Sequence, residues 1–332
     1  MKRLRKCGLL LTYCLLLCLL TRSGMPALYV YFLDVGQADC TLLRQGDDAL
    51  LIDGGNVADG ALISRVLCEL QVDQLSYVIC THAHEDHAGG LSRVLAACEV
   101  ENLLSSVYRS DNAAFASLQK QAELRQIPIQ TVSVGQQFSL GRVRVTVLGP
   151  QELDEDVNNQ SVVLRVDYGA LSLLFTGDAE KSAERDLIKR EMPLEADILH
   201  VGHHGSATSS CDAFLKAVMP DYAVISVGQD NAYNLPAPSV LDRLKNSGTQ
   251  ILRTDQQGSI LALCTPHAAD FRFIVFPDGL DGFEGVVGNA SSLIYHTANC
   301  PYLPDEQNRV YLSSIQQAQN MGYSVHARCA AD

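Results

Sequence analysis

Residues 81–90 read Thr81-His82-Ala83-His84-Glu85-Asp86-His87-Ala88-Gly89-Gly90, and four of them are histidine or aspartate side chains in the spacing of a metal site. The apolar run Leu75–Cys80, which is typical of a buried strand, ends directly before this stretch. A run with helical spacing, from about Leu91 to Ala97, begins directly after it. Because these side chains can converge only in a loop, and because imidazole with carboxylate suits zinc and related first-row ions, the stretch predicts a metal centre.

Within this loop, the spacing divides the four side chains into two pairs. His82 and His84 are alternate residues, which point the same way in an extended segment. Asp86 and His87 follow a turn and can face a second ion. The alternative is a chance cluster of surface polar residues, which the specific spacing disfavours.

The rest of the chain, from residue 27 to 276, alternates short β-rich runs with helical patterns. Two apolar runs echo each other, because Leu50–Gly55 and Leu173–Asp178 each place an aspartate beside glycine at the end of a strand. This alternation in two similar halves predicts a layered α/β protein with two sheets packed between helices. The strands are expected at 27–35, 40–44, 49–53, 75–81, 162–167, 171–176, 197–201 and 222–227, and the helices at 61–70, 91–97, 183–190, 213–218 and 240–246.

The motif H-x-H-x-D-H after a strand resembles the signature of the metallo-β-lactamase superfamily. The surrounding sequence is similar to one branch of it, the soluble domain of ComEC/Rec2-like proteins and its free-standing relatives. The resemblance implies an αββα four-layer sandwich over residues 27–277, followed by a small C-terminal module. The further motifs that carry it are Leu33–Asp39, Asn158–Leu164, Thr176–Asp178, His203–Ser206, and Arg253–Asp255 with Gly258.

Carried over to this sequence, the resemblance implies one or two core metal ions, Zn²⁺ or Mn²⁺. His82 and His84 would hold one ion, Asp86 and His87 the other, and Asp178 would bridge the two.

The resemblance also implies supporting and catalytic residues around these ligands. His204, or with less support His203, would face the substrate as a proton donor or oxyanion stabiliser, and the alternative for both is an ordinary helix-start loop. The catalytic group would comprise Asp86, His204 and His203. The residues behind the ligands would be Asp53, Asp34 and Asn159.

One segment departs from the branch. A histidine usually precedes the proline of a Tyr-Gly-His-Pro-like stretch there, whereas this chain has Tyr233-Asn234-Leu235-Pro236. Because Leu235 cannot bind a metal, three alternatives remain for the second site: it is weaker, it uses water or His204 in place of the missing ligand, or it is empty. A further alternative is that the protein has lost its activity altogether.

The first 24 residues have the pattern of an export segment. A basic start is followed by the apolar run Gly8–Leu20, which is short for a membrane-spanning helix, and polarity returns at Thr21–Gly24. Residues 1–24 are therefore expected to be a signal peptide or an N-terminal anchor. The alternative is a buried core helix, which the lack of an amphipathic face disfavours. The expected location is extracytoplasmic, either secreted or anchored to the outer face of a bacterial cytoplasmic membrane.

The charge of the chain constrains its partners. It has 25 basic and 38 acidic residues, a formal net charge of −13, and five of the basic residues lie in the export segment. Such a surface excludes a non-specific nucleic-acid coat, but not a nuclease, since divalent ions can invert the local field. Membrane contact is expected only through the N-terminal segment, and no obligate protein partner is evident.

A second set of metal ligands lies in the tail, expected as a separate module at residues 285–332. His296, Cys300, His326 and Cys329 form the pattern H-x₃-C-x₂₅-H-x₂-C, which is the separation found in small structural zinc modules. It resembles the metal-binding domain of Ada proteins, with histidine at two of the four positions. The alternative is a Cys300–Cys329 disulfide in an exported protein.

Together these features predict an exported metal-dependent hydrolase that acts on ester bonds through metal-activated water. A phosphodiesterase or nuclease, with a phosphodiester or nucleic acid as substrate, fits the two-metal site best. The alternatives are a hydrolase of another envelope ester, such as a phosphocholine ester or lactone, and a non-catalytic binding module whose second metal site has decayed.

Overall fold

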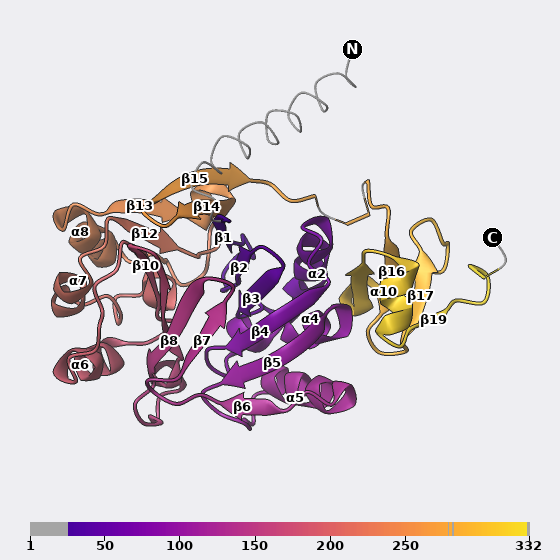
Figure 1. Ribbon diagram of the computed structural model, residues 1–332, viewed down its shortest axis with the longest axis horizontal. Coiled ribbons are helices and arrows are strands. Elements are labelled where there is room, and N and C mark those ends of the chain that lie inside the picture. The colour runs from indigo at the N-terminus through magenta and orange to yellow at the C-terminus, as the bar shows by residue number, and fades with distance from the viewer. Residues whose placement is uncertain (1–25, 278, 281, 331–332) are drawn as a thin grey trace, which may run out of the picture.

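The computed structural model of this chain describes residues 26–277, 279–280 and 282–330, so the expected export segment, residues 1–24, lies outside it. An eight-stranded sheet has the order β15-β14-β1-β2-β3-β4-β5-β6, and strands from both ends of the first domain meet in it (Figure 1). The elements of its first part are β1 Leu28–Phe32, β2 Thr41–Gln45, β3 Asp48–Ile52, α2 Gly60–Glu69, β4 Gln74–Cys80, α3 Glu85–Ala88, α4 Leu91–Ala97, β5 Glu99–Ser105, α5 Ala113–Arg125 and β6 Ile129–Thr131.

A seven-stranded sheet follows, with the order β13-β12-β11-β10-β9-β8-β7. The chain then returns to the first sheet through β14 and β15. The elements of this second part are β7 Gln137–Leu140, β8 Val143–Gly149, η3 Val157–Gln160, β9 Val163–Tyr168, β10 Leu171–Phe175, α6 Lys181–Lys189, β11 Ile198–His200, η4 Gly202–Gly205, α7 Asp212–Val218, β12 Tyr222–Ile225, α8 Pro238–Asn246, β13 Gln250–Arg253, α9 Thr254–Gln257, β14 Ser259–Thr265 and β15 Ala268–Ile274.

The two sheets face each other, and the strands show why. In β1, Val30 and Phe32 point into the core between the sheets, while Tyr31 points to the layer of α2, α4 and α5. This is the period of two that a strand imposes on its side chains. Helices α6, α7 and α8 cover the outer face of the second sheet through a third apolar cluster (Figure 1). The αββα sandwich expected from the sequence is confirmed.

The stretch from residue 98 to residue 149, where no elements are expected from the sequence pattern, contains β5, α5, β6, β7 and β8. Helix α5 is difficult to recognise because only four of its residues are buried, namely Ala114, Phe115, Leu118 and Ala122. Within the described residues, no helix combines the length and the apolar character needed to cross a membrane.

The C-terminal residues form a small four-stranded sheet with the order β18-β16-β17-β19. It docks on α2 and α4 rather than standing apart (Figure 1). The elements are β16 Val286–Asn289, β17 Ile294–Thr297, η5 Glu306–Asn308, β18 Arg309–Leu312, α10 Ile315–Asn320 and β19 Ser324–Val325.

The contact between this module and the sandwich is well packed. The guanidinium of Arg65, on α2, lies 4.3 Å from the ring centroid of Phe283 and 5.7 Å from that of Tyr311. The backbone N–H of Tyr311 donates to Ser64 Oγ at 3.1 Å, and Tyr323 donates its hydroxyl to Ala96 O at 3.0 Å. Several apolar side chains of the module therefore belong to the same buried cluster as α2 and α4.

Candidate metal centre

The metal-binding side chains come from loops at the ends of parallel strands. Strands β3 and β4 run parallel in the first sheet, and β10 and β11 run parallel in the second. Asp53 follows β3, His82 follows β4, Asp178 follows β10, and His204 follows β11. Because the carboxyl ends of parallel strands meet at one edge, and the two sheets face each other, these four loops converge on one site.

His82 and His84 form the first pair, as expected from their spacing. His82 Nε2 lies 3.1 Å from His84 Nδ1, and His82 Nδ1 lies 3.3 Å from Ser161 Oγ. Burial, together with the neighbouring charge of His87, holds the pKa of His82 well below its usual value. His82 is therefore a neutral imidazole, which is the form that binds metal.

His87 lies between two buried carboxylates. Its Nδ1 is 2.8 Å from Asp53 Oδ2, and its Nε2 is 3.2 Å from Asp178 Oδ1. Asp53 also accepts hydrogen bonds from the backbone N–H and the hydroxyl of Thr81, both at 2.7 Å. Burial alone would lower the pKa of His87, but the carboxylates of Asp178 and Asp53 raise it well above its usual value. Asp53 thus fixes the ring from behind, as expected, and directs Nε2 toward Asp178.

His204 is held in the same way on the other side of the site. Its Nδ1 donates to Ser226 O at 3.0 Å and lies 3.3 Å from Asp39 Oδ1, while its Nε2 lies 3.3 Å from Asp86 Oδ2. Although burial raises the pKa of Asp86, the hydrogen bond from His204 and the charges of His87 and His204 together lower it to about 2. His203 and His204 both have φ of 52°, a strained backbone conformation for non-glycine residues that is common at functional sites.

Asp178 is the centre of the cluster. Its carboxylate lies within 4.0 Å of ring nitrogens of four histidines, and its backbone N–H donates to Ser161 Oγ at 3.0 Å. Although burial raises the pKa of this carboxyl, the charges of His87 and His204 bring it well below its usual value. Asp178 is therefore ionised. It lies near His82 from the first expected ligand pair and near His87 from the second, which is the position of a bridging ligand.

The side chains present fit a metal centre. Asp86, His87, Asp178 and His204 each offer one ligand atom, and these atoms lie within 4.8 Å of one another. Within the described residues, His87 Nε2 and Asp178 Oδ1 are buried and lack a hydrogen-bond partner. Burying such atoms unpaired is costly, and a divalent cation between them would remove that cost. His82 and His84 lie beside this group and offer a second ligand pair.

Position 235 has a different role from the one that a histidine there would have. The Leu235 side chain packs against the apolar cluster between the second sheet and α6–α8. Its backbone N–H donates to Asn231 Oδ1 at 3.0 Å, and its carbonyl accepts from Asn231 Nδ2 at 2.7 Å. The four-residue group around Asp178 is assembled without this position, because His204 completes it.

The remaining expected residues divide between the site and its surroundings. Asn159 Oδ1 accepts from the backbone N–H groups of Glu180 and Ala183, so it caps α6 just after Asp178. His203 is partly exposed, with 24% of its side chain accessible, whereas 2% of the His204 side chain is accessible. His203 therefore faces solvent, and His204 lies inside the cluster.

Asp34 does not lie behind the ligands as the resemblance implied. It is exposed, and its carboxylate accepts from the backbone N–H of Gly36 at 3.3 Å. Asp39, five residues later, is buried instead against His204, and its carboxylate lies 3.8 Å from His200 Nε2. The sequence contains both aspartates in one motif, and only the turn between them decides which is buried.

The tail residues also converge. His296 Nδ1 lies 3.4 Å from Cys300 Sγ, and His326 Nδ1 lies 3.8 Å from Cys300 Sγ and 3.7 Å from Cys329 Sγ. All four ligand atoms lie within 4.8 Å of one another, and both cysteines are free thiols. This donor set fits a four-coordinate zinc site.

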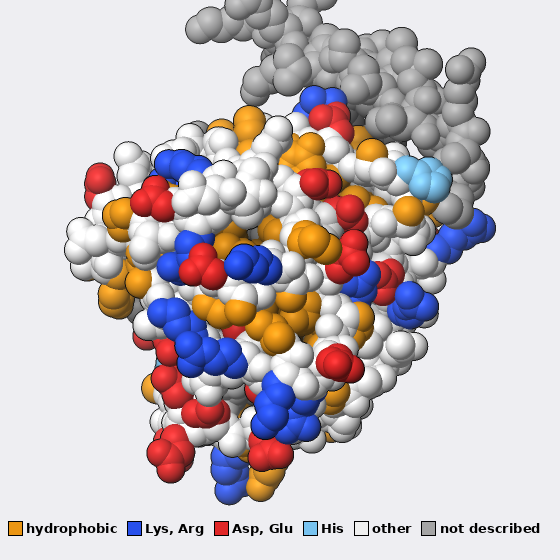
Figure 2. Space-filling view, turned by 90° about the vertical axis from the view of Figure 1, so that its left-hand side faces the viewer, with side chains coloured by type: hydrophobic (Ala, Val, Ile, Leu, Met, Phe, Trp, Pro, Cys, Tyr) orange, Lys and Arg blue, Asp and Glu red, His pale blue; other side chains and the backbone are white. Residues whose placement is uncertain are grey.

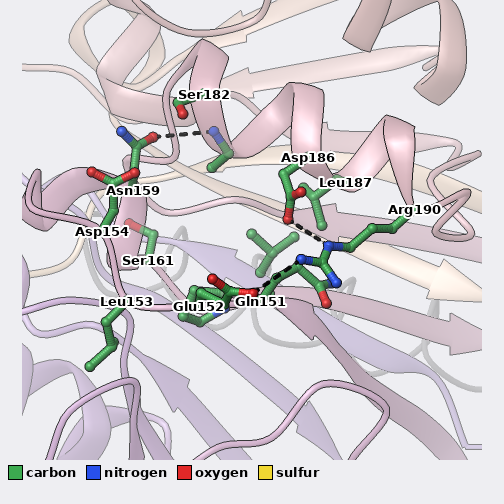
Figure 3. A pocket seen from close by; sticks show the side chains of 14 residues that line it. Gln151, Glu152, Leu153, Asp154, Asn159, Ser161, Ser182, Asp186, Leu187 and Arg190 are labelled. Atoms are coloured by element: carbon green, nitrogen blue, oxygen red, sulfur yellow. Dashed lines mark hydrogen bonds and ion pairs between the residues drawn. The ribbon is translucent and has the colours of Figure 1, made fainter.

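A pocket of about 260 Å³ adjoins the metal centre on the side of α6. It lies between the loop after β8 and this helix, and its lining includes Asn159 and Ser161 (Figure 3). Ser161 Oγ lies 3.3 Å from His82 Nδ1, so this residue connects the pocket with the metal centre. Arg190 crosses it, with ion pairs to Asp186 at 2.9 Å and to Glu152 at 3.5 Å. The charges on this side of α6 are therefore already paired.

These features define a class of protein that comparison also identifies. Residues 33–229 match the family model described as the metallo-beta-lactamase superfamily, and the chain belongs to this superfamily. Its fold and histidine–aspartate cluster are those of a metal-dependent hydrolase.

Within the superfamily, the chain is similar to ComEC/Rec2-like proteins, as its motifs predict. It is 34% identical over 230 residues to competence protein ComA of Neisseria gonorrhoeae, covering 68% of this chain and 31% of the relative. It is 33% identical over 190 residues to ComE operon protein 3 of Bacillus subtilis, covering 57% and 24%. The chain thus spans about a quarter to a third of the length of these relatives.

The chain is also similar to solved structures at low sequence identity. The metallo-beta-lactamase fold protein YhfI from Bacillus subtilis is 14% identical, with a TM-score of 0.46, covering 69% of this chain and 96% of that one. The metal-dependent hydrolase Tm1679 is 13% identical, with a TM-score of 0.46, covering 68% and 95%.

Proposed function

We propose that the chain is an exported metal-dependent phosphodiesterase or nuclease that hydrolyses its substrate with metal-activated water. The observation that carries the proposal is the pair of buried atoms His87 Nε2 and Asp178 Oδ1, which face each other at 3.2 Å and form no hydrogen bond with other described residues, beside the second ligand pair His82 and His84. Two ligand sets that share one carboxylate are the arrangement used for in-line displacement at phosphorus.

Divalent ions bound there would lower the pKa of a coordinated water and neutralise the charge of a phosphodiester. The protein's own groups hold this arrangement rigid. Asp53 fixes the ring of His87, and Asp39 with Ser226 O fixes the ring of His204. Among the described residues, no serine or cysteine lies in a strand–turn–helix nucleophile arrangement at this site, and none is needed.

The proton donor to the leaving group is best assigned to His203. The sequence favours His204, but His204 is buried and directs Nε2 at Asp86. His203 stands at the rim, with Nδ1 3.2 Å from Glu180 Oε1 and Nε2 3.8 Å from Asp178 Oδ2. A partly exposed histidine with one nitrogen oriented by a carboxylate and the other toward the centre is placed for proton transfer.

The test is hydrolysis of an activated aryl phosphodiester by the purified protein with Zn²⁺ or Mn²⁺. The wild type is expected to turn over, and His84→Ala and Asp86→Ala are expected to abolish turnover while the fold is retained. A metal-loaded wild type that leaves diesters and nucleic acids intact would contradict the proposal. Turnover of a phosphocholine ester or a lactone in parallel assays would then assign the chain to another envelope ester, and inactivity on all of them to a binding module.

For the tail we propose one structural Zn²⁺ held by His296, Cys300, His326 and Cys329, in an Ada-like module. Four protein ligands leave no open position, so this ion would stabilise the fold and take no part in hydrolysis. Histidine at two of the positions makes the site less anionic than four thiolates would. The extracytoplasmic location rests on the sequence of residues 1–24.

A further inference from the structure

Helix α6 leaves the metal centre immediately after Asp178 and carries an unusual set of charges. Its basic side chains Lys181, Arg185 and Lys189 are spaced four residues apart, so they lie along one side of the helix. At a rise of 1.5 Å per residue, the two ends of this row are about 12 Å apart. Arg185 and Lys189 are exposed, and Lys181 is half-buried beside the site.

The acidic residues of the same segment are already committed to other partners. Glu180 is paired with His203, and Asp186 is paired with Arg190. Glu184 is buried and accepts from the backbone N–H groups of Ser210 and Cys211 at the start of α7.

Within the described residues, the three cations of the row have no ion pair with any carboxylate, unlike the neighbouring Arg190. A helix turns by about 100° per residue, so the row lies on a different side of α6 from the pocket that Asp186 and Arg190 face (Figure 3). Figure 2, which looks onto the side of the molecule formed by α6, α7 and α8, shows lysine and arginine side chains standing out on this surface among acidic ones. The chain as a whole has a formal charge of −13. A row of cations without ion pairs that begins at the metal centre is therefore a positively charged strip on an otherwise acidic protein.

We infer that Lys181, Arg185 and Lys189, together the α6 row, bind successive phosphates of a linear phosphodiester chain and lead it to the metal centre. This inference rests on the proposed function and narrows it, because a small diester would occupy the metal centre alone. Unpaired lysine and arginine groups on a straight helix contact a polyanionic backbone without reading its sequence. The row is therefore a specificity element that favours polymers.

The experiment measures binding of a fluorescent single-stranded phosphorothioate oligonucleotide of roughly 12 residues by anisotropy, with the metal-loaded full chain. The test variant is Lys181→Gln/Arg185→Gln/Lys189→Gln. The matched control is Lys120→Gln/Arg142→Gln/Lys245→Gln. It likewise removes two lysines and one arginine, here from exposed positions elsewhere in the chain. Both variants have the same net charge.

The salt dependence separates a phosphate-binding row from a general charge effect. Three phosphate contacts to a single strand contribute a slope of about −2 in log affinity against log salt, equivalent to roughly 20-fold between 50 and 200 mM. The test variant is expected to lose this slope, and the control is expected to keep it. Equal losses in both variants, or no loss in either, would overturn the inference.

A second readout keeps the inference distinct from the proposed function. The ratio of kcat/KM on an ordinary oligonucleotide to kcat/KM on an activated small diester is expected to fall at least about 10-fold in the test variant, through KM. A wild type that hydrolyses the small diester but neither binds nor cleaves the oligonucleotide would overturn the inference and leave the proposed function standing. A wild type that hydrolyses neither would overturn the proposed function.

Discussion

His87 Nε2 and Asp178 Oδ1 face each other at 3.2 Å in the buried centre of the protein, and no other described residue forms a hydrogen bond with either atom. Both groups are fixed from behind, His87 by Asp53 and Asp178 by the hydroxyl of Ser161. Two opposed and immobilised ligand atoms that form no hydrogen bond with other groups are the signature of a site preorganised for a cation. Substitutions at this site and around it should therefore change metal binding or stability in specific ways.

Replacing the shared carboxylate should affect both ions. Asp178→Asn is expected to lower the metal content of the core by at least one ion per chain, because the variant removes the carboxylate that lies within 4.0 Å of His82, His87, His203 and His204. Hydrolysis should fall by more than about 100-fold. Elemental analysis of the purified variant beside the wild type measures the first effect. Unchanged metal content would show that Asp178 is not a ligand.

The orienting role of Asp39 is tested against its neighbour in the same motif. Asp39→Asn should reduce metal affinity or activity about 10- to 100-fold, because His204 loses the carboxylate that helps fix its ring. Asp34→Asn is the matched control. The carboxylate of the exposed Asp34 accepts a hydrogen bond from the nearby Gly36, so its replacement should have no effect on metal binding. A larger effect of Asp34→Asn than of Asp39→Asn on a metal titration would refute the assignment.

Restoring histidine at position 235 should not add a metal ligand. The Leu235 side chain packs in an apolar cluster, so Leu235→His places a polar ring there and should cost about 1–3 kcal/mol of unfolding free energy. Leu235→Met, which conserves volume, should cost less than about 1.5 kcal/mol. Denaturant unfolding measures both values. A gain of one ion per chain in Leu235→His would contradict the packing seen here.

The tail metal should stabilise the hydrolase domain as a whole. Because the tail shares a buried cluster with α2 and α4, Cys300→Ser should lose one zinc and lower the melting temperature of a single cooperative transition. Ala97 O, which accepts from Gln317 at 2.9 Å, ties the tail to the end of α4. Two separate thermal transitions, with only the smaller one altered by Cys300→Ser, would show instead that the tail folds independently.

Much of the site follows from sequence because its ligands follow strands that the sequence marks clearly. His82, His84, Asp86 and His87 adjoin the apolar strand β4, and Asp178 ends the apolar strand β10, so local pattern and motif agree. The four tail ligands can be predicted from the sequence by their spacing alone.

The remainder depends on tertiary structure. The backbone between Asp34 and Asp39 turns so that only the second carboxylate is buried, and no local pattern records this. The different burial of His203 and His204 has the same origin, because it is set by a loop in which both residues have a left-handed backbone. The use of Leu235 for packing depends on a cluster that includes residues of β8, β9, β10 and β11, which are distant from it in the sequence.

The metal content of the Cys300→Ser variant tests the central claim most directly, because it isolates the core from the tail site. The structure predicts two ions per chain, held by His82 with His84 and by Asp86 with His87 and His204, with Asp178 between them. One ion or none, in a variant that remains folded, would contradict a two-metal centre that is complete without a ligand at position 235.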